Sequence, residues 1–517
     1  MSSSRTKNAS RNIFFGMLNT ITRLILPFVT RTVMIHYLGM KYLGLGSFFS
    51  SLLQVLSITE AGIGGALVYK MYEPMAQGND ELVCALLAFY RKCYRIIGII
   101  VMTIGIGILP FLKYLIKSDI PSDVSIYVLY LINLFNTVIG YFLFAYKGSI
   151  LAASQRNDVM SRVGIGLYIF QVIMQIIFVV VFKNYYLYVL VTPAMAMLSN
   201  LFTSYVVDHM YPQYTCKGKL DKKVLYSLKQ QVGGLIFQKI GTIVLFNVDT
   251  IVISASLGLL ILAKYNNYYY ILTSLTGVLT VITSSIIPSV GNSLVTKEKK
   301  DLLCDLKKFT FCYVAICSWF ASCYLSLVQP FIELWIGKEN QFSMTTVILM
   351  AVYLYTLKMN DVVWVYREAG GLWWEGKFVP AVAAAVNLAF NLILVNMIGL
   401  PGIVISTIIS MIVVYFPWGS YILFNCFFES KKEWKKYMLR HVGYMIGAVC
   451  SATITYMLCS RININLWLTL FFRGMVCLVV PNAVFFALFC KTESFDLAKQ
   501  FTKGFVKKAY RKMRHSI

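Results

Sequence analysis

Residues 216–223 read Cys-Lys-Gly-Lys-Leu-Asp-Lys-Lys, a short basic segment that separates two long apolar stretches, 185–210 and 231–257. Each stretch is long enough to cross the hydrocarbon core of a bilayer as a helix, which takes about 20 residues. Hydrophobic residues make up 58% of the chain and charged residues 13%, whereas a soluble domain is about half apolar and about 25% charged. The composition therefore predicts a protein that crosses a membrane several times.

The same alternation of apolar stretch and polar loop continues in both directions along the chain. A helix satisfies its own backbone hydrogen bonds in lipid, so we expect an all-α polytopic membrane protein. We identify fourteen apolar spans, at 13–38, 43–69, 96–116, 124–147, 160–182, 185–210, 231–257, 264–291, 309–336, 343–366, 378–397, 401–424, 441–459 and 466–490.

Positive charge is distributed very unevenly between alternate loops. With the N-terminus in the cytoplasm, and with residues at the ends of spans counted in the adjoining loops, the inside segments hold 35 of the 47 Lys and Arg residues, the outside loops hold 6, and 6 lie within spans. Because cytoplasmic loops carry an excess of such residues, we expect both termini to be cytoplasmic. The net charge of +25 then lies where it meets anionic lipid headgroups, which argues against a nucleic-acid partner.

The chain also contains an internal repeat. Residues 31–39, Arg-Thr-Val-Met-Ile-His-Tyr-Leu-Gly, resemble 249–258, Asp-Thr-Ile-Val-Ile-Ser-Ala-Ser-Leu-Gly, and two more matches keep the offset of 218–220 residues. An offset of six spans is typical of parallel repeats in transporters, so we expect two six-helix lobes related by a pseudo-two-fold axis along the membrane normal. The expected parts are an N-terminal lobe 1–210, a basic cytoplasmic linker 211–230, a C-terminal lobe 231–424, two extra helices 441–490 and a basic cytoplasmic tail 491–517.

Charged residues within the spans are the candidate functional residues, because charge is costly inside a bilayer. Arg23 and Arg31 lie on the first span, about 80° apart around a helix, so both can face one cavity. On the seventh span, we expect Lys239 to lie roughly level with Arg23 and Asp249 roughly level with Arg31. We interpret Arg23, Arg31 and Lys239 as cationic substrate-binding residues; the alternative is structural pairing with snorkelling to the membrane surface.

Four further charges are candidates for gating or ion coupling. Asp249 is one, as the acidic partner of the cationic residues or as a proton or cation site. Glu60 precedes the glycine-rich segment 61–65. Lys358 and Asp361 are i,i+3 neighbours, and their alternative role is to neutralise each other.

Enzymatic motifs are absent from the sequence. It contains no G-x-S-x-G, H-E-x-x-H or Walker A pattern, the motifs of several hydrolases and of ATPases. The 12 Cys residues include no C-x-x-C pair, so neither a metal site nor a disulfide framework is indicated. We expect a protein that is not an enzyme, uses no cofactor, and moves its cargo either by equilibration or with a proton or sodium gradient.

Several short motifs follow one another in a fixed order along nearly the whole chain. They are Arg31-Thr, Leu38-Gly39, Tyr42-Leu-Gly44-Leu, Gly62-Ile-Gly-Gly65, Asp249-Thr, Leu257-Gly258, Lys264-Tyr-Asn, Asn387-Leu-Ala-Phe-Asn391, Gly399-Leu-Pro-Gly402-Ile, Thr407 and Ser410. In this order the chain resembles the polysaccharide-transporter branch of the multidrug/oligosaccharidyl-lipid/polysaccharide exporter superfamily.

The resemblance implies a flippase of the bacterial inner (plasma) membrane that works by alternating access, with a central cavity lined by spans 1, 2, 7 and 8. The implied cargo is an undecaprenyl-diphosphate-linked oligosaccharide for O-antigen, capsule or exopolysaccharide synthesis. The implied partners are membrane lipids, glycosyltransferases and a polymerase. In the lipid II flippases of the superfamily, the last two spans form a groove for the polyprenyl tail, which the fourteen spans here permit.

Three alternatives stay open. A cation-coupled multidrug exporter of the same superfamily would need an acidic or aromatic cavity for cationic drugs. A lipid II flippase would have a denser cluster of cavity arginines. A membrane-embedded polysaccharide polymerase would need a large outer loop for its catalytic residues, and the outside loops here are short.

Overall fold

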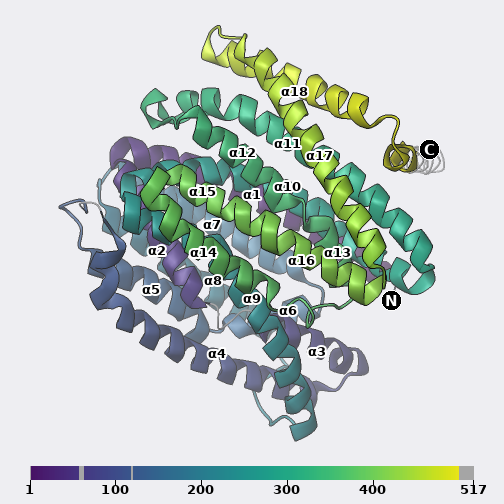
Figure 1. Cartoon of the computed structure of the whole chain (residues 1–517). Coiled ribbons are helices and arrows are strands. Elements are labelled where there is room, and N and C mark those ends of the chain that lie inside the picture. The colour runs from purple at the N-terminus through teal and green to yellow at the C-terminus, as the bar shows by residue number, and fades with distance from the viewer. Residues whose placement is uncertain (1, 58–62, 118–119, 500–517) are drawn as a thin grey trace. The chain divides into compact units, whose positions relative to one another are not determined.

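The described part of the chain is helical throughout. The computed structural model describes residues 2–57, 63–117 and 120–499, and these contain no β-strand (Figure 1). By their internal contacts they form two compact units, Met1–Asn266 and Asn267–Ile517. The helical architecture confirms the expected fold class.

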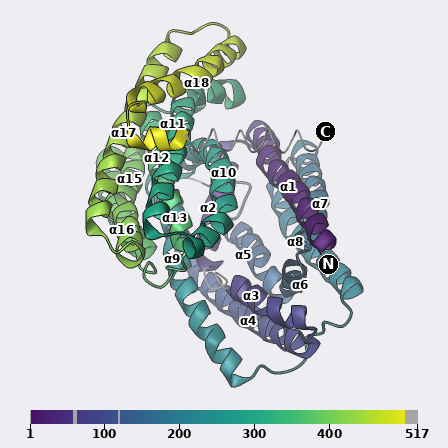
Figure 2. The same ribbon diagram turned by 90° about the vertical axis from the view of Figure 1, so that its right-hand side faces the viewer.

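In the described residues, the first unit holds nine α-helices and the beginning of a tenth. Their bounds are α1 Ser2–Tyr37, α2 Met40–Leu56, α3 Ile63–Gln77, α4 Asp80–Ile108, α5 Ile126–Phe142, α6 Gly148–Ala153, α7 Asn157–Val180, α8 Tyr185–Met210, α9 Lys222–Leu257 and α10 Leu259–Thr296. α1 packs along α7, α7 packs on α8, and α8 packs on α5 (Figure 2). α2 packs against α9, so by its contacts α9 lies in the first unit.

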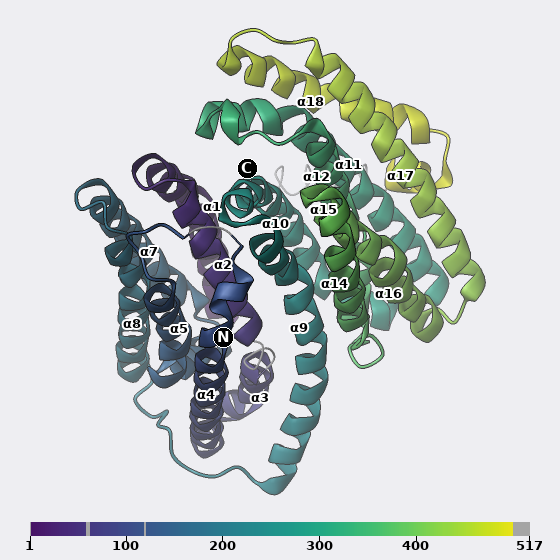
Figure 3. The same ribbon diagram turned by 60° about the vertical axis from the view of Figure 1, so that its left-hand side comes forward.

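The second unit is organised around one long helix, α11, which packs on α12, α17 and α18. α14 packs on α15 (Figure 3). The bounds are α11 Lys299–Ile336, α12 Met344–Lys358, α13 Asp361–Ala369, α14 Val379–Ile398, α15 Leu400–Ile409, α16 Phe416–Ile422, α17 Lys431–Ser460 and α18 Leu466–Phe489. π-helical turns at Ser410–Tyr415 and Leu423–Phe427 continue α15 and α16 into one apolar segment.

Most of the expected membrane spans correspond to long apolar helices. Within the described residues, 11 helices are long and apolar enough to cross a membrane, or up to 12 if the bent pair Ile126–Phe142 and Ala145–Ala153 counts as one span. The other two expected spans, 13–38 and 43–69, fall on α1, which carries two arginines there, and on α2, which has only 17 residues before the undescribed segment 58–62. The chain is therefore a multi-pass membrane protein, and the exact number of fourteen spans stays a prediction.

The two Leu-Gly motifs of the proposed repeat adopt nearly the same backbone conformation. Gly39 has φ 105° and ψ 168° where α1 gives way to α2, and Gly258 has φ 88° and ψ 173° where α9 gives way to α10. A side chain disfavours this positive-φ region, which glycine reaches freely. The shared geometry explains why both motifs end in glycine; the superposition of two six-helix lobes, and their boundaries, stay predictions.

Gly44 marks a close approach of two backbones in the first unit. A Cβ atom placed on Gly44 in α2 would overlap the backbone carbonyl of Leu259 at the start of α10. Leu43 and Leu45 beside it are buried, as are Leu259 and Leu262. The glycine of the Tyr-Leu-Gly-Leu motif thus permits tight packing that any larger residue would prevent.

Candidate functional site

Arg23 is held by side chains of α1 and α7. Its Nε donates a 3.2 Å hydrogen bond to Oδ1 of Asn19, one helical turn earlier. Its guanidinium lies over the Tyr168 ring of α7, 5.0 Å from the ring centroid, a geometry in which the ring face attracts a cation. Within the described residues Arg23 is in no ion pair and its side chain is exposed, so its positive charge remains available to a ligand.

Arg31 lies two turns further along α1 and shares a neighbour with Arg23. One of its terminal nitrogens donates a 3.4 Å hydrogen bond to the backbone carbonyl of Asn266. Tyr168 is within electrostatic reach of both arginines, and Tyr188 of α8 is within reach of Arg31. Tyr168 is therefore a neighbour that the two arginines share, and the sequence analysis did not identify it. That both arginines line one cavity stays a prediction.

Lys239 and Asp249 both lie on α9 but in different surroundings. Lys239 is exposed. Asp249 is only 4% exposed and takes part in interactions within the protein, in a buried polar stretch with Asn247 and Ser254. Ten residues separate the two charges along the helix, which corresponds to about 15 Å, so they do not form a pair.

In the second unit, Lys358 and Asp361 form the centre of a buried polar network. The Lys358 Nζ lies 3.0 Å from Oδ2 of Asp361 and also donates a 2.9 Å hydrogen bond to Oγ1 of Thr280. The Tyr313 hydroxyl donates a 2.6 Å hydrogen bond to the same Asp361 oxygen. The pairing of these two charges, which the sequence reading considered as an alternative role, is present.

The helix break between α12 and α13 creates this arrangement. Lys358 is the last residue of α12 and Asp361 the first residue of α13, with Asn360 as its N-cap. An acidic residue in a first turn and a basic residue in a last turn both suit the helix dipole. The break thus places opposite charges where each helix end favours them.

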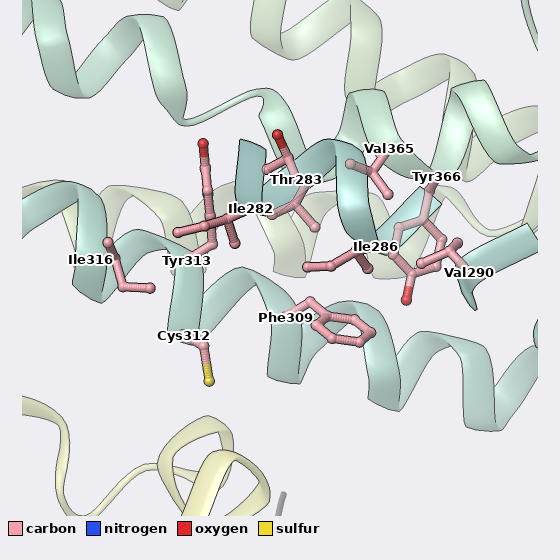
Figure 4. A pocket seen from close by; sticks show the side chains of 11 residues that line it. Ile282, Thr283, Ile286, Val290, Phe309, Cys312, Tyr313, Ile316, Val365 and Tyr366 are labelled. Atoms are coloured by element: carbon pink, nitrogen blue, oxygen red, sulfur yellow. The ribbon is translucent and has the colours of Figure 1, made fainter. Parts of the chain in front are cut away.

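An apolar cavity of about 220 Å³ adjoins this network in the second unit (Figure 4). α10 contributes Ile282 and Ile286, α11 contributes Phe309 and Tyr313, and α13 contributes Val365 to its wall. Tyr313 links the two features, because its ring lines the cavity while its hydroxyl binds Asp361.

Glu60 lies outside the described residues, so its role stays a prediction. Within residues 2–57, 63–117 and 120–499, no group of three or more His, Cys, Asp or Glu side chains is arranged to hold a metal ion.

Comparisons with known proteins place the fold among transporters. No family model and no curated protein matches the sequence. Among solved structures, the chain is similar to the lipid II flippase MurJ in an inward closed conformation, with a TM-score of 0.65 at 14% identity over 92% of this chain and 98% of MurJ. It is similar to an inward-facing multidrug resistance transporter of the MATE family, with a TM-score of 0.54 at 15% identity over 82% and 99% of the two chains.

A mutant of the Vibrio cholerae MATE transporter VcmN is similar as well, with a TM-score of 0.56 at 14% identity over 84% of this chain and 99% of VcmN. At these identities the likeness concerns the fold. The chain therefore has the fold of the MOP-superfamily transporters.

Proposed function

We propose that this chain is a bacterial inner-membrane flippase that moves an undecaprenyl-diphosphate-linked oligosaccharide to the outer leaflet for surface polysaccharide synthesis. The observation that carries the proposal is Arg23, an exposed cation within the expected first span that has an aromatic neighbour and no acidic partner in the described residues. A cation inside a bilayer is costly and is usually functional. A diphosphate supplies the anion that would compensate it.

The charged and hydroxylated groups of the proposed cargo suit the cationic and aromatic side chains of the first unit. Arg23 and Arg31 are about 12 Å apart along α1, far enough to contact a diphosphate and an acidic or hydroxylated sugar of the same molecule. Guanidinium groups form strong charge-assisted hydrogen bonds with phosphate. Tyr168 presents a ring beside Arg23, and Lys239 supplies a third cation on α9.

The buried acidic residues are assigned to gating or ion coupling. Asp249 and the Lys358–Asp361 pair are charges whose energy depends strongly on their surroundings, so a proton or sodium ion at these positions would favour one conformation over another. Glu60 is assigned the same kind of role. We expect glycosyltransferases and a polymerase to act before and after the transport step.

A second candidate function is cation-coupled multidrug export. The specific observation in its favour is Asp249, a carboxylate only 4% exposed, because a cationic drug needs a buried anion. The uncompensated Arg23 argues against it, since a cation in the same unit would repel such a substrate.

A deletion strain of the source bacterium tests the proposal. Loss of surface polysaccharide with accumulation of its lipid-linked precursor, restored by the wild-type chain but not by Arg23→Gln, is the expected result. Unchanged polysaccharide with new sensitivity to cationic drugs would favour the multidrug exporter instead. Arrest of cell-wall synthesis with accumulated lipid II would assign the cargo of a lipid II flippase.

A further inference from the structure

Three arginines converge on one buried carboxylate where α1 meets the start of α7. Arg11 of α1 lies 2.9 Å from Oδ2 of Asp158, Arg162 of α7 lies 3.1 Å from the same oxygen, and Arg156 lies 2.9 Å from Oδ1. The Asp158 side chain is 0% exposed, while the arginines remain 33%, 44% and 22% exposed in the order just given. The carboxylate is therefore enclosed and the guanidinium groups still reach the surface.

The charges in this cluster do not balance. In the described residues, none of the three arginines is paired with any acid other than Asp158, so two positive charges remain uncompensated. Each guanidinium carries several N–H donors in a fixed fork, and its contact with Asp158 is made through one nitrogen: Nη2 of Arg11, Nε of Arg156 and Nη2 of Arg162. Most of the hydrogen-bonding capacity of the cluster is left for another anion.

Further contacts hold the backbone around Asp158 and the side chain of Arg162. Oδ1 of Asn12 accepts a 2.7 Å hydrogen bond from the backbone N–H of Asp158, and its Nδ2 donates a 2.9 Å bond to the Gln155 carbonyl. The Arg162 guanidinium lies over the Phe15 ring, 4.2 Å from the centroid. Because Asp158 already restrains all three arginines, a ligand would have to order these side chains less on binding.

We infer that Arg11, Arg156 and Arg162 form a binding site for phosphate groups, with Asp158 as the residue that positions them. Planar guanidinium groups match the oxygens of a phosphate in bidentate geometry, and α7 begins at Asn157, so its N-terminal dipole adds attraction for an anion. Two sources supply this chemistry: the headgroup of a phosphate-bearing lipid, or a free diphosphate in solution.

The inference does not depend on the proposed cargo, because binding is measured without transport. The full chain is purified and tested with two probes: inorganic pyrophosphate by calorimetry in detergent, and phosphatidic acid in nanodiscs against a phosphatidylcholine reference. The variants are Arg11→Gln with Arg162→Gln, and Arg162→Lys, which keeps the charge but loses the fork. The control is Lys432→Gln, an exposed cation on α17.

We expect the double variant to bind at least one probe about tenfold or more weakly, Arg162→Lys to bind with intermediate affinity, and Lys432→Gln to bind like the wild type. Raising the salt concentration should weaken the wild-type interaction. If the double variant binds both probes more weakly, the site recognises the phosphate group itself. If it binds only phosphatidic acid more weakly, the site recognises a lipid headgroup.

Folding is checked by size-exclusion chromatography and helical circular dichroism of each variant. Arg162→Lys keeps the proposal testable if the double variant does not fold. The inference is overturned if the wild type binds neither probe, or if folded variants bind both probes as tightly as Lys432→Gln does.

Discussion

The Lys358 ammonium group and the Asp361 carboxylate are 3.0 Å apart at a break between two helices, and Tyr313 donates to the same carboxylate oxygen. The Lys358 side chain is 9% exposed and that of Asp361 19%. Removal of one partner from a pair this deeply buried strands the other charge, whereas removal of both can be nearly neutral.

This pair gives the first prediction. We expect Asp361→Ala to destabilise the second unit by about 3 kcal/mol and Lys358→Met by a similar amount. The double variant should lose much less than the two losses together. Thermal unfolding of the purified protein measures all three, and strictly additive losses would show that the two charges do not interact.

The second prediction concerns the arginines of α1. Arg23→Ala and Arg31→Ala should each abolish polysaccharide export while the protein stays folded in the membrane, since each loss removes a charged hydrogen bond of roughly 1.5–3 kcal/mol to the cargo. The assay measures surface polymer and lipid-linked precursor in the same cells. Arg461→Ala, in an expected outer loop, serves as the control. Normal surface polymer in the Arg23/Arg31 double variant would rule out a cationic substrate site.

Topology gives the third prediction. We expect Lys219→Cys, in the basic segment between α8 and α9, to be unreachable by a membrane-impermeant thiol reagent in intact cells. Lys338→Cys, in an expected outer loop, should be labelled in the same background, from which the 12 native Cys residues have been removed. The opposite orientation would place the loops rich in Lys and Arg outside the cell, against the positive-inside rule. Labelling of residue 219 from outside would invert the orientation.

The sequence alone predicts those structural features that depend on the spacing of residues within one helix. Sequence analysis identified most of the long apolar helices, and it recognised that Lys358 and Asp361 can meet because they are three residues apart. It did not find Thr280 or Tyr313, which lie 78 and 48 residues from their partners, nor Tyr168 under Arg23. Which side chains meet across two helices depends on helix packing, and the sequence pattern of one span carries no information about the register of its neighbour.

The fourth prediction tests the packing of α2. Gly44→Ala places a methyl group against the Leu259 carbonyl, and overpacking of this kind costs about 1–3 kcal/mol. Gly107→Ala is the matched control, because it too lies in a helix but nothing lies within 4 Å of its Cβ position; there alanine should be neutral or stabilise the helix by up to about 1 kcal/mol. Opposite shifts of the unfolding temperature are expected, and equal shifts would mean that α2 and α10 do not pack closely.

The last prediction concerns Arg31 and Asp249, which occupy matching positions in the two Leu-Gly repeats. We expect them to pair in one conformation of the transport cycle and to separate in another. Asp249→Asn should then impair transport, because the arginine loses its partner in one state only and the balance between states changes. Exchange of the charges, Arg31→Asp with Asp249→Arg, should recover part of the activity if pairing is what matters. If Asp249 carries the coupling proton instead, the exchange will not restore transport, and Asp249→Asn will transport independently of pH. Transport by Asp249→Asn at the wild-type rate at every pH would contradict both roles and leave Asp249 as a buried structural residue.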